Sequence, residues 1–244
     1  MSHRLCAVIV SRGLDELLRF CLKNFFESAS GLSGQVQVIV ADNASARPYT
    51  ASSFPDSRVR LLRFDTQTGF AAACNRAVQE CDAEQLLFLN NDVLLDRSTL
   101  VRMMEHCDAP GIGVIGSWLY FPDGRVQHRG VVFGSDDIGP YHLDRGGYLE
   151  PRCAFQEFQA VTGACLMVER ELFSRIGGFD ESYSFGLEDI DFCLRVRQSG
   201  RRVICVNAGR PLHFESLTPG RVELDVSSRQ LFLQRWRGKY SIDG

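Results

Sequence analysis

The chain has 244 residues, of which 45% are hydrophobic and 23% are charged. These are ordinary values for a folded globular protein, so the composition excludes disordered, collagen-like and coiled-coil classes. The 27 Lys and Arg residues face 30 Asp and Glu residues, which leaves a formal net charge of −3. A chain without a basic excess has no global field that attracts nucleic acid, and we expect no nucleic-acid partner.

Short apolar runs alternate with helical patterns through the first half of the chain. Residues 5–10 (LCAVIV) are a β-branched run typical of a buried strand, and residues 14–29 carry apolar side chains at helical spacing. The alternation continues with predicted strands at 35–45, 59–64 and 85–95 and predicted helices at 69–81 and 98–107. Strands and helices that alternate over short connections predict a parallel, doubly wound sheet.

The alternation is weaker in the second half. Residues 111–134 look extended, with a turn at Pro122-Asp123-Gly124, and the Gly- and Pro-containing residues 135–153 predict a loop. Such a loop beside a cleft either closes over a ligand or is a passive surface segment. Beyond it we predict strands at 161–168 and 202–206 and helices at 169–176 and 188–199. No linker or repeat divides the chain, which favours one α/β domain over two.

The nine cysteines include no CxxC pair, so zinc-ribbon and thioredoxin-like chemistry is unsupported. Their number is odd and most lie in apolar runs, which is typical of buried, reduced thiols in a cytosolic protein. No apolar run approaches the roughly 18 residues of a membrane span, and the N-terminal run is too short for a signal peptide. We therefore expect a cytoplasmic protein, either free or at the inner face of the cell membrane.

The C-terminal segment mixes cationic and aromatic side chains. Residues 227–240 (SSRQLFLQRWRGKY) carry Phe232, Trp236 and Tyr240 among Arg and Lys residues. A basic, aromatic helix of this kind can lie on anionic lipid, which would give peripheral membrane contact. The same side chains also suit packing against the core, and the sequence leaves both alternatives open.

Residues 111–116 (GIGVIG) match the GxGxxG pattern of dinucleotide-binding loops. That fingerprint needs a strand before it and a helix after it. Here a predicted helix and Asp108-Ala109-Pro110 precede it, and an aromatic run follows it. We therefore interpret the segment as a strand with turn glycines, and we predict no nicotinamide site.

Polar residues lie at the ends of three predicted strands. They are Ser11-Arg12, Asp42-Asn43 and Asn90-Asn91-Asp92. In an open parallel sheet, ligands bind at the carboxyl ends of the strands, so these residues form a candidate site. An Asp inside an apolar run is costly unless it is paired or binds a metal. The alternative is turn chemistry, in which Asx side chains only cap the segments that follow.

Three carboxylates open the helix predicted from residue 188. Glu188 and Asp191 share one face of it, whereas Asp189 points elsewhere. Arg195 lies four residues beyond Asp191 and can pair with it, and acidic residues in a first turn suit the helix dipole. Against this structural explanation stands a functional hypothesis, a general base at the helix N-terminus aimed into the cleft.

A single His follows the last predicted strand. His213, in the sequence RPLHFES, has no second His at ligand spacing, and a lone His is more often structural. If His213 faces Asp92, however, imidazole and carboxylate together suit Mn²⁺ or a similar ion. A structural His and a metal ligand therefore stay open as alternatives.

Taken in order, these segments resemble the family 2 glycosyltransferases of the GT-A fold, in particular their bacterial rhamnosyltransferase-like branch. The resemblance runs from about Cys6 to Trp236 and rests on VIVSRG, VIVADNAS, TGFAAACNRA, LLFLNNDVLL, DGRVQHRGVVF, VTGACLMVERELFSRIGGFDESYSFGLEDIDFCLRVRQSG and LHFESLTPGR. It implies a Rossmann-like, mostly parallel central sheet with helices on both faces in a single domain. Its nucleotide-sugar-binding half would span about 1–110, its acceptor-binding half about 111–220 and its C-terminal helix about 222–240.

The resemblance further implies an inverting, metal-dependent transferase. Its donor would be a nucleoside-diphosphate sugar, its cofactor Mn²⁺ or Mg²⁺, and its acceptor a glycan or lipid-linked hydroxyl. By position, Asp189 resembles the catalytic base with Glu188 beside it, while Asp92 and His213 resemble the metal ligands. The implied donor-binding residues are Ser11, Asp42, Asn43, Gly69, Phe70, Asn75, Asn90, Asn91, Thr162 and Gly163. Among them Asp42 would read the base, and the last two would line the sugar and acceptor pocket.

The sequence departs from the family pattern at the donor site. Its DxD motif begins with Asn90, Ser11-Arg12 replaces a more usual aromatic-plus-Asn pair, and Gln67 stands where Asn is common. The donor stays open between dTDP-rhamnose and a UDP-sugar, and the expected process is cell-surface polysaccharide synthesis. Two alternatives are a catalytically silent GT-A carbohydrate-binding or scaffold domain and a sugar-1-phosphate nucleotidyltransferase. A third concerns context, since the chain would also suit one module of a larger protein.

Overall fold

A computed structural model describes residues 3–13, 15–32, 35–54, 56–135, 139–150, 152–184, 186–215 and 222–244. Its strands are β1 (His3–Ser11), β2 (Val36–Asn43), β3 (Val59–Phe64), β4 (Ala83–Leu89), β5 (Val93–Leu94), β6 (Ile112–Ser117), β7 (Leu119–Tyr120), β8 (Val126–His128), β9 (Val131–Phe133), β10 (Pro140–His142), β11 (Phe155–Phe158), β12 (Cys165–Glu169), β13 (Arg202–Val206) and β14 (Leu212–His213). Its helices are α1 (Asp15–Ala29), α2 (Phe70–Val78), α3 (Thr99–Met104), α4 (Arg170–Ile176), α5 (Glu188–Gln198) and α6 (Val222–Trp236), with a 3₁₀ turn at Ala51–Ser53.

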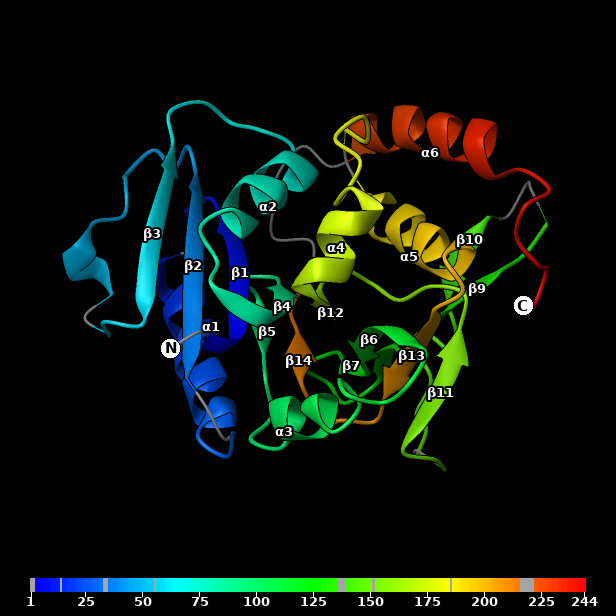
Figure 1. Cartoon of the computed structure of the whole chain (residues 1–244), viewed down its shortest axis with the longest axis horizontal. Coiled ribbons are helices and arrows are strands. Elements are labelled where there is room, and N and C mark those ends of the chain that lie inside the picture. The colour runs from blue at the N-terminus through cyan, green and yellow to red at the C-terminus, as the bar shows by residue number, and fades with distance from the viewer. Residues whose placement is uncertain are drawn as a thin grey trace.

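Eight strands form one sheet in the order β11-β13-β6-β12-β4-β1-β2-β3 (Figure 1). Strands β3, β2, β1 and β4 pair in parallel, and so do β6 and β13. Strand β12 joins these two groups through antiparallel ladders to β4 and β6, and β11 is antiparallel to β13 at the edge. The sheet is therefore mostly parallel, as the sequence predicts. It also unites strands from both halves of the chain in one domain.

A smaller sheet has the order β5-β14-β7-β8. Strand β5 follows the polar residues 90–92 directly, whereas β14 lies near the end of the chain and contains His213. The two strands pair in antiparallel fashion. The small sheet thus brings two segments together that are far apart in the sequence.

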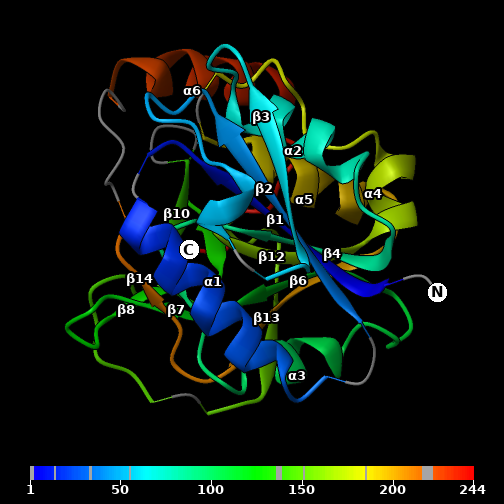
Figure 2. The same cartoon turned by 90° about the vertical axis from the view of Figure 1, so that its left-hand side faces the viewer.

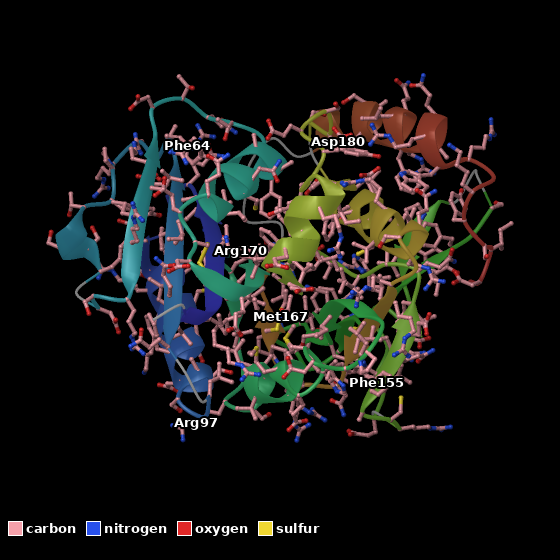
Figure 3. All side chains as sticks on the ribbon, in the orientation of Figure 1. Phe64, Arg97, Phe155, Met167, Arg170 and Asp180 are labelled. Carbon is pink, nitrogen blue, oxygen red and sulfur yellow. A yellow bond between two sulfur atoms is a disulfide. The ribbon has the colours of Figure 1, made fainter. Side chains whose placement is uncertain are left out.

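The pleat of the central strands divides the apolar side chains between two cores. Along β1, Val8 belongs to the core that contains α2, α4 and α5, whereas Ala7 and Ile9 belong to the core that contains α1 and α3. This alternation has the period of two that a strand imposes. Figure 2 shows the two groups of helices on opposite sides of the sheet, so helices cover both faces. In Figure 3, Met167 of β12 lies in the middle of the molecule and Phe155 of β11 lies near its rim.

Several predicted elements are confirmed and one is wrong in extent. The strands predicted at 59–64 and 202–206 are β3 and β13, and the GIGVIG segment lies in strand β6 with no helix after it. The sequence at 85–95 predicts a strand interrupted by Asn-Asn-Asp, and the interruption is confirmed, because residues 90–92 turn away between β4 and β5. The strand predicted at 161–168 begins only at Cys165, because the preceding residues bond to the site instead of a neighbouring strand.

The segment predicted as a loop at 135–153 is more ordered than expected. It contains β10, which pairs with β9, and Arg145 forms an ion pair with Glu215 at 2.6 Å. Strand β11, which follows this segment, was not predicted either. Asp136 and Asp137 lie outside the described residues. The β10–β9 pairing and the Arg145–Glu215 ion pair therefore hold the described part of the segment, and its closure over a ligand stays a prediction.

The cysteines do not all stay reduced, which corrects the expectation from the sequence. Cys6 in β1 and Cys81 just after α2 form a disulfide, with their Cα atoms 6.0 Å apart. The expectation fails because α2 packs against β1 and returns the chain to it. The other cysteines are free, and among them Cys153 is exposed.

The C-terminal helix α6 packs on the core. Phe232 and Trp236 are buried, and the ring of Phe232 stacks beside those of Phe133 and Tyr240, which also contact each other. Of the two alternatives for this segment, packing is the one that the structure shows, and these aromatic side chains are not free to enter a lipid surface. Across the described ranges, no helix is long and apolar enough to cross a membrane.

Candidate functional site

The carboxyl ends of β1, β2 and β4 meet at one edge of the sheet, where the polar residues predict a site. The Asn91 side chain donates from Nδ2 to Ser11 Oγ at 2.9 Å, which links the ends of β4 and β1. Ser11 Oγ also lies 3.0 Å from the hydroxyl of Tyr49, in the loop after β2. Ser11 and Asn91, which lie 80 residues apart in the sequence, are therefore in direct contact.

Asp42 lies at the end of β2 but is fully buried. Its carboxylate accepts hydrogen bonds from the backbone N–H groups of Ser45 and Tyr49, at 3.0 and 3.1 Å, and pairs with Arg63 at 2.7 Å. Burial by itself would raise the pKa of Asp42, but these donors outweigh it and lower the pKa. In this structure Asp42 therefore shapes the loop after β2. The turn explanation fits that geometry better than direct contact with a nucleobase.

Asn43 connects the end of β2 with the segment before α2. Its side-chain oxygen accepts from the Thr68 N–H at 2.8 Å, and its side-chain nitrogen donates to the Thr68 carbonyl at 2.9 Å. Gly69 follows as the N-cap residue of α2, and Phe70 begins the helix. This contact places the start of α2 beside the strand ends, together with two more of the predicted donor-binding residues.

Asn75, in the body of α2, is engaged elsewhere. Its side chain donates to the Phe179 carbonyl at 2.8 Å and accepts from the Phe179 N–H at 3.0 Å. It lines a hollow of about 530 Å³ together with Arg195 and Arg235. Asn75 therefore fastens α2 to the segment between α4 and α5, and its contact with the donor stays a prediction.

Asp92 and His213 face each other across the small sheet. His213 Nε2 lies 3.2 Å from Asp92 Oδ1, and both side chains are largely buried. The pairing of β14 with β5 produces this contact, because it sets His213 opposite Val93. Asn90 adds a side-chain nitrogen 3.4 Å from His213 Nε2. An imidazole nitrogen beside a carboxylate oxygen is a donor set that fits Mn²⁺ or a similar divalent ion.

The turn at residues 162–164 connects this pair with the start of α5. The Asn90 N–H donates to the Ala164 carbonyl at 2.9 Å, and the Gly163 N–H donates to Asp189 Oδ2 at 2.6 Å. Gly163 is needed for this approach, because an added Cβ would lie 3.1 Å from the Asp189 Cβ. One short turn therefore contacts both the residue that opens the 90–92 motif and the predicted base.

Glu188 is buried and Asp189 is half-buried at the first turn of α5. Burial raises the pKa of both carboxyls, and the charge of Asp189 contributes to raising the pKa of Glu188 to about 8. Hydrogen bonds from the Gly163 and Ile190 N–H groups offset part of this effect at Asp189. Leu187, directly before them, has a φ of +71°, which is uncommon for a residue other than Gly. Raised carboxyl pKa values beside a strained backbone are typical of functional sites.

Asp191 is the structural member of the three carboxylates. It pairs with Arg195 at 2.7 Å, as the spacing of four predicts. Arg235 and Trp236 of α6 donate to Asp191 Oδ1 at 2.9 and 2.7 Å. Asp191 therefore anchors α6 on α5, and this role is separate from that of Asp189.

Sequence reasoning missed the residues that support the site from neighbouring strands and from the loop after β2. They are Tyr49, Arg63, Gln127 and His128. Gln127 contacts His213, and the next residue, His128, accepts from the Thr162 N–H through Nε2 at 3.4 Å. These contacts join distant segments and leave no local pattern. The one available signal was that two polar residues follow each other in a stretch, DGRVQHRG, that otherwise predicts a turn and a buried strand.

Comparison with known proteins matches almost the whole chain to glycosyltransferases. The sequence profile described as "Glycosyl transferase family 2" matches residues 6–177, and one described as "N-terminal domain of galactosyltransferase" matches residues 151–217. The chain is 34% identical over 190 residues to the O-antigen biosynthesis protein RfbC of Myxococcus xanthus, covering 74% of this chain and 15% of that protein. It is 27% identical over 228 residues to the N-acetylglucosaminyl-diphospho-decaprenol L-rhamnosyltransferase of Mycobacterium tuberculosis, covering 82% of this chain and 74% of that one. The chain spans 22% and 15% of the length of the first two curated relatives that it matches.

Solved structures show the same architecture. The mannosyltransferase PcManGT from Pyrobaculum calidifontis, in complex with GDP-Man and Mn²⁺, superposes with a TM-score of 0.64 at 17% sequence identity. The match covers 90% of this chain and 59% of that one. A likeness at this level of identity is a likeness of fold, and the fold is the GT-A fold that the sequence implies.

Proposed function

Because the chain belongs to glycosyl transferase family 2, we propose that it transfers a sugar from a nucleoside diphosphate to a hydroxyl group. The observation that carries the proposal is the turn at residues 162–164. On one side this turn contacts the motif that ends in Asp92, which faces His213, and on the other side it contacts Asp189. Glycosyl transfer needs both kinds of group at once, since a diphosphate must leave while a hydroxyl loses its proton.

We assign the divalent cation to Asp92 and His213. In the ranges that the structure describes, no third His, Cys, Asp or Glu joins them, so the other ligands would be water and the donor diphosphate. When bound, Mn²⁺ or Mg²⁺ supplies Lewis acidity that neutralises the charge of the leaving diphosphate. Asn90 and Asn91 carry no charge, and their part is to bind and orient through hydrogen bonds.

Asp189 is the general base in this proposal. The Gly163 N–H orients its Oδ2, and the raised pKa makes it a stronger base than an ordinary carboxylate. Asp189 takes the proton of the acceptor hydroxyl as that oxygen bonds to the anomeric carbon and the bond from that carbon to the diphosphate breaks. Attack opposite the leaving group inverts the anomeric configuration. Glu188 holds its proton near neutral pH, which leaves the single charge of the pair on Asp189.

The strand ends of the first half form the donor side. Asn43 lies beside the start of α2, Ser11 contacts Tyr49 in the loop after β2, and the buried Asp42 holds the same loop, which would receive the base. The names of the curated relatives support dTDP-rhamnose as the first donor to test and a UDP-sugar as the second. They also support a glycan or lipid-linked acceptor in cell-surface polysaccharide synthesis. We place this reaction at the inner face of the cell membrane.

The test is thermal unfolding with UDP, dTDP, GDP and CDP, each with and without Mn²⁺. A ligand at 100 times its Kd stabilises the folded state by about 2.7 kcal/mol, which raises the Tm by several degrees. We expect a shift with one nucleoside diphosphate only, and only when Mn²⁺ is present. The Asp92→Ala variant should lose this shift.

Three other outcomes would contradict the proposal in different places. A nucleotide-induced rise in Tm that does not depend on Mn²⁺ would contradict the assignment of the cation to Asp92 and His213. No shift with any nucleotide favours a catalytically silent domain. Mn²⁺-dependent binding together with wild-type turnover in Asp189→Asn would show that Asp189 is not the general base.

A further inference from the structure

We infer that Gln127 is a positioning residue that sets the tautomer of His213 and keeps its Nε2 atom free to bind a cation. Gln127 is the middle residue of β8, and only 2% of its surface is exposed. The inference rests on the proposed function for the identity of the ligand at Nε2. The tautomer itself follows from the contacts of Gln127 alone.

An irregularity in the small sheet aims Gln127 at His213. Leu119 of β7 pairs with His128, and the next residue, Tyr120, pairs with Val126. Gln127 is therefore the extra residue of a β-bulge. Bulges re-aim side chains and are frequent beside active sites. Here the bulge lets a side chain from β8 reach His213 in β14, although β7 lies between these two strands.

Two hydrogen bonds fix the orientation of the Gln127 amide. Its Nε2 donates to the backbone carbonyl of His213 at 3.1 Å, and its Oε1 lies 2.6 Å from His213 Nδ1. If the amide were reversed, its oxygen would face the carbonyl oxygen, and neither atom can donate. The Gln127 oxygen must therefore face Nδ1, and Nδ1 must carry the proton.

The protonated Nδ1 determines the state of the opposite nitrogen. In a neutral imidazole only one nitrogen carries hydrogen, so the lone pair of His213 lies on Nε2. The side-chain nitrogen of Asn90, 3.4 Å away, is in position to donate to that lone pair. Asp92 Oδ1, 3.2 Å away, would instead be repelled by it unless a cation lies between them. Metal-binding His residues commonly donate their other N–H to an oxygen of the protein, as His213 does here.

Without Gln127, His213 could adopt the opposite tautomer, with its proton on Nε2. A ring without an acceptor at Nδ1 is free to place its proton on Nε2, and Asp92 is ready to accept it. That proton would occupy the position of the cation. Gln127 therefore acts on the site through His213 and needs no contact with substrate.

The first test reads the tautomer and needs no metal. In ¹⁵N-labelled protein at neutral or higher pH, long-range proton–nitrogen correlations distinguish the two neutral forms of a His ring. The chain has five His residues, and the His213→Asn variant identifies the signals of His213. We expect hydrogen on Nδ1 in the wild type and on Nε2 in Gln127→Met. Hydrogen on Nε2 in the wild type, or an unchanged tautomer in the variant, overturns the inference.

The second test measures Mn²⁺ binding in the presence of dTDP or UDP, by the electron paramagnetic resonance signal of free Mn²⁺. Gln127→Met should weaken the affinity about 10- to 100-fold, the usual effect of losing a residue that orients a metal ligand. Gln127→Glu keeps an acceptor for Nδ1 but sets a second oxygen against the His213 carbonyl, so it should weaken the affinity less than Gln127→Met does. An unchanged affinity in Gln127→Met overturns the role of Gln127 toward the cation.

Gln159→Met is the matched control. Gln159 is 8% exposed, and like Gln127 it bonds twice to one residue: Nε2 donates to the Ser241 carbonyl at 2.7 Å, and Oε1 accepts from the Ser241 N–H at 2.9 Å. This variant should keep the wild-type tautomer and Mn²⁺ affinity. Equal losses in both variants would mean general loosening of the fold and would overturn the inference. If the wild type binds no Mn²⁺ with either nucleotide, the proposed metal site fails, and the tautomer still decides the role of Gln127.

Discussion

Asp42 at the end of β2 and the Glu188–Asp189 pair at the start of α5 are all withdrawn from solvent, yet their pKa values shift in opposite directions. Asp42 accepts from two backbone N–H groups and from Arg63, and its pKa is lowered. The described residues place no Arg or Lys in an ion pair with Glu188 or Asp189, and burial raises both pKa values. Burial alone therefore does not decide whether a carboxylate keeps its charge; the donors around it do.

The difference distinguishes a carboxylate that supports the structure of the site, Asp42, from the pair that is proposed to act in the reaction, Glu188 and Asp189. A carboxylate that is held by three donors resists protonation and keeps a loop in shape. A carboxylate that has backbone donors but no Arg or Lys partner, and a second carboxylate beside it, takes up a proton more readily, which is what a base must do. Substitutions on the two sides of this contrast should therefore change different properties of the protein, and the largest effect is expected at Asp189.

Asp189→Asn should give the largest effect. The amide has nearly the shape of the carboxylate but cannot accept the acceptor's proton, so kcat should fall about 10²- to 10⁴-fold. Binding of the nucleoside diphosphate with Mn²⁺ should stay unchanged, and its thermal shift serves as the control. Wild-type turnover in this variant would remove Asp189 from the mechanism.

Asp42→Ala should instead lower stability. It leaves two backbone N–H groups and Arg63 without their acceptor, and we expect a loss of about 2–3 kcal/mol in the free energy of unfolding, measured in urea. The control is Asp56→Ala. Asp56 also pairs with an Arg, Arg58, at 2.7 Å, but at the surface, where such a pair contributes at most about 1 kcal/mol. Equal losses in the two variants would contradict the framework role of Asp42.

Glu188→Gln should change how stability depends on pH. The pKa of Glu188 rises from its ordinary value of 4.5 to about 8 in the folded state, so the folded chain binds this proton more tightly than the unfolded chain. Its contribution to stability is present below pH 4.5 and is lost as the pH rises toward 8. Gln cannot titrate, so the advantage of the variant over the wild type in the free energy of unfolding should grow as the pH rises from 4.5 toward 8. Parallel stability curves across this range would show that Glu188 is not the titrating group.

Gly163→Ala should have the smallest effect. The added methyl group would lie 3.1 Å from the Asp189 Cβ and must displace it by a few tenths of an ångström. Because catalysis is sensitive to such shifts, we expect kcat to fall a few-fold with little change in stability. In the control Gly31→Ala, the methyl group would press on Val101, away from the site, and kcat should stay at the wild-type value. Equal kcat values for the two variants would mean that the turn does not position Asp189.

Local patterns in the sequence were enough for much of the fold. The apolar run of β1 and the helical spacing in α1 predict a buried strand and a helix that packs on it, and the pairing of Asp191 with Arg195 follows from a spacing of four. Local patterns also predict where the candidate site lies on the sheet. Polar residues at strand ends indicate its edge of the sheet, because parallel strands end together.

The rest depends on contacts between distant segments. From the sequence, Asp42 is predicted to bind the donor base. Only the structure shows that it is buried and paired with Arg63 of β3. From the sequence, Asn75 is predicted to lie in the donor site. Only the structure shows that its side-chain amide bonds to the backbone of Phe179. The Cys6–Cys81 disulfide and the bulge at Gln127 likewise arise from neighbours in space. Propensity and periodicity describe one segment at a time and carry no information on which segments meet.

The contact between β5 and β14 has a consequence for how the protein matures. It joins the middle of the chain to a segment near its end, and closing so long a loop delays the contact relative to local structure. During synthesis on the ribosome, Asp92 and Asp189 emerge before His213, so the carboxylates are in place while the imidazole is still missing. If Asp92 and His213 hold the cation as proposed, a nascent or half-folded chain lacks the cation site, and donor binding becomes possible only after β14 has paired with β5.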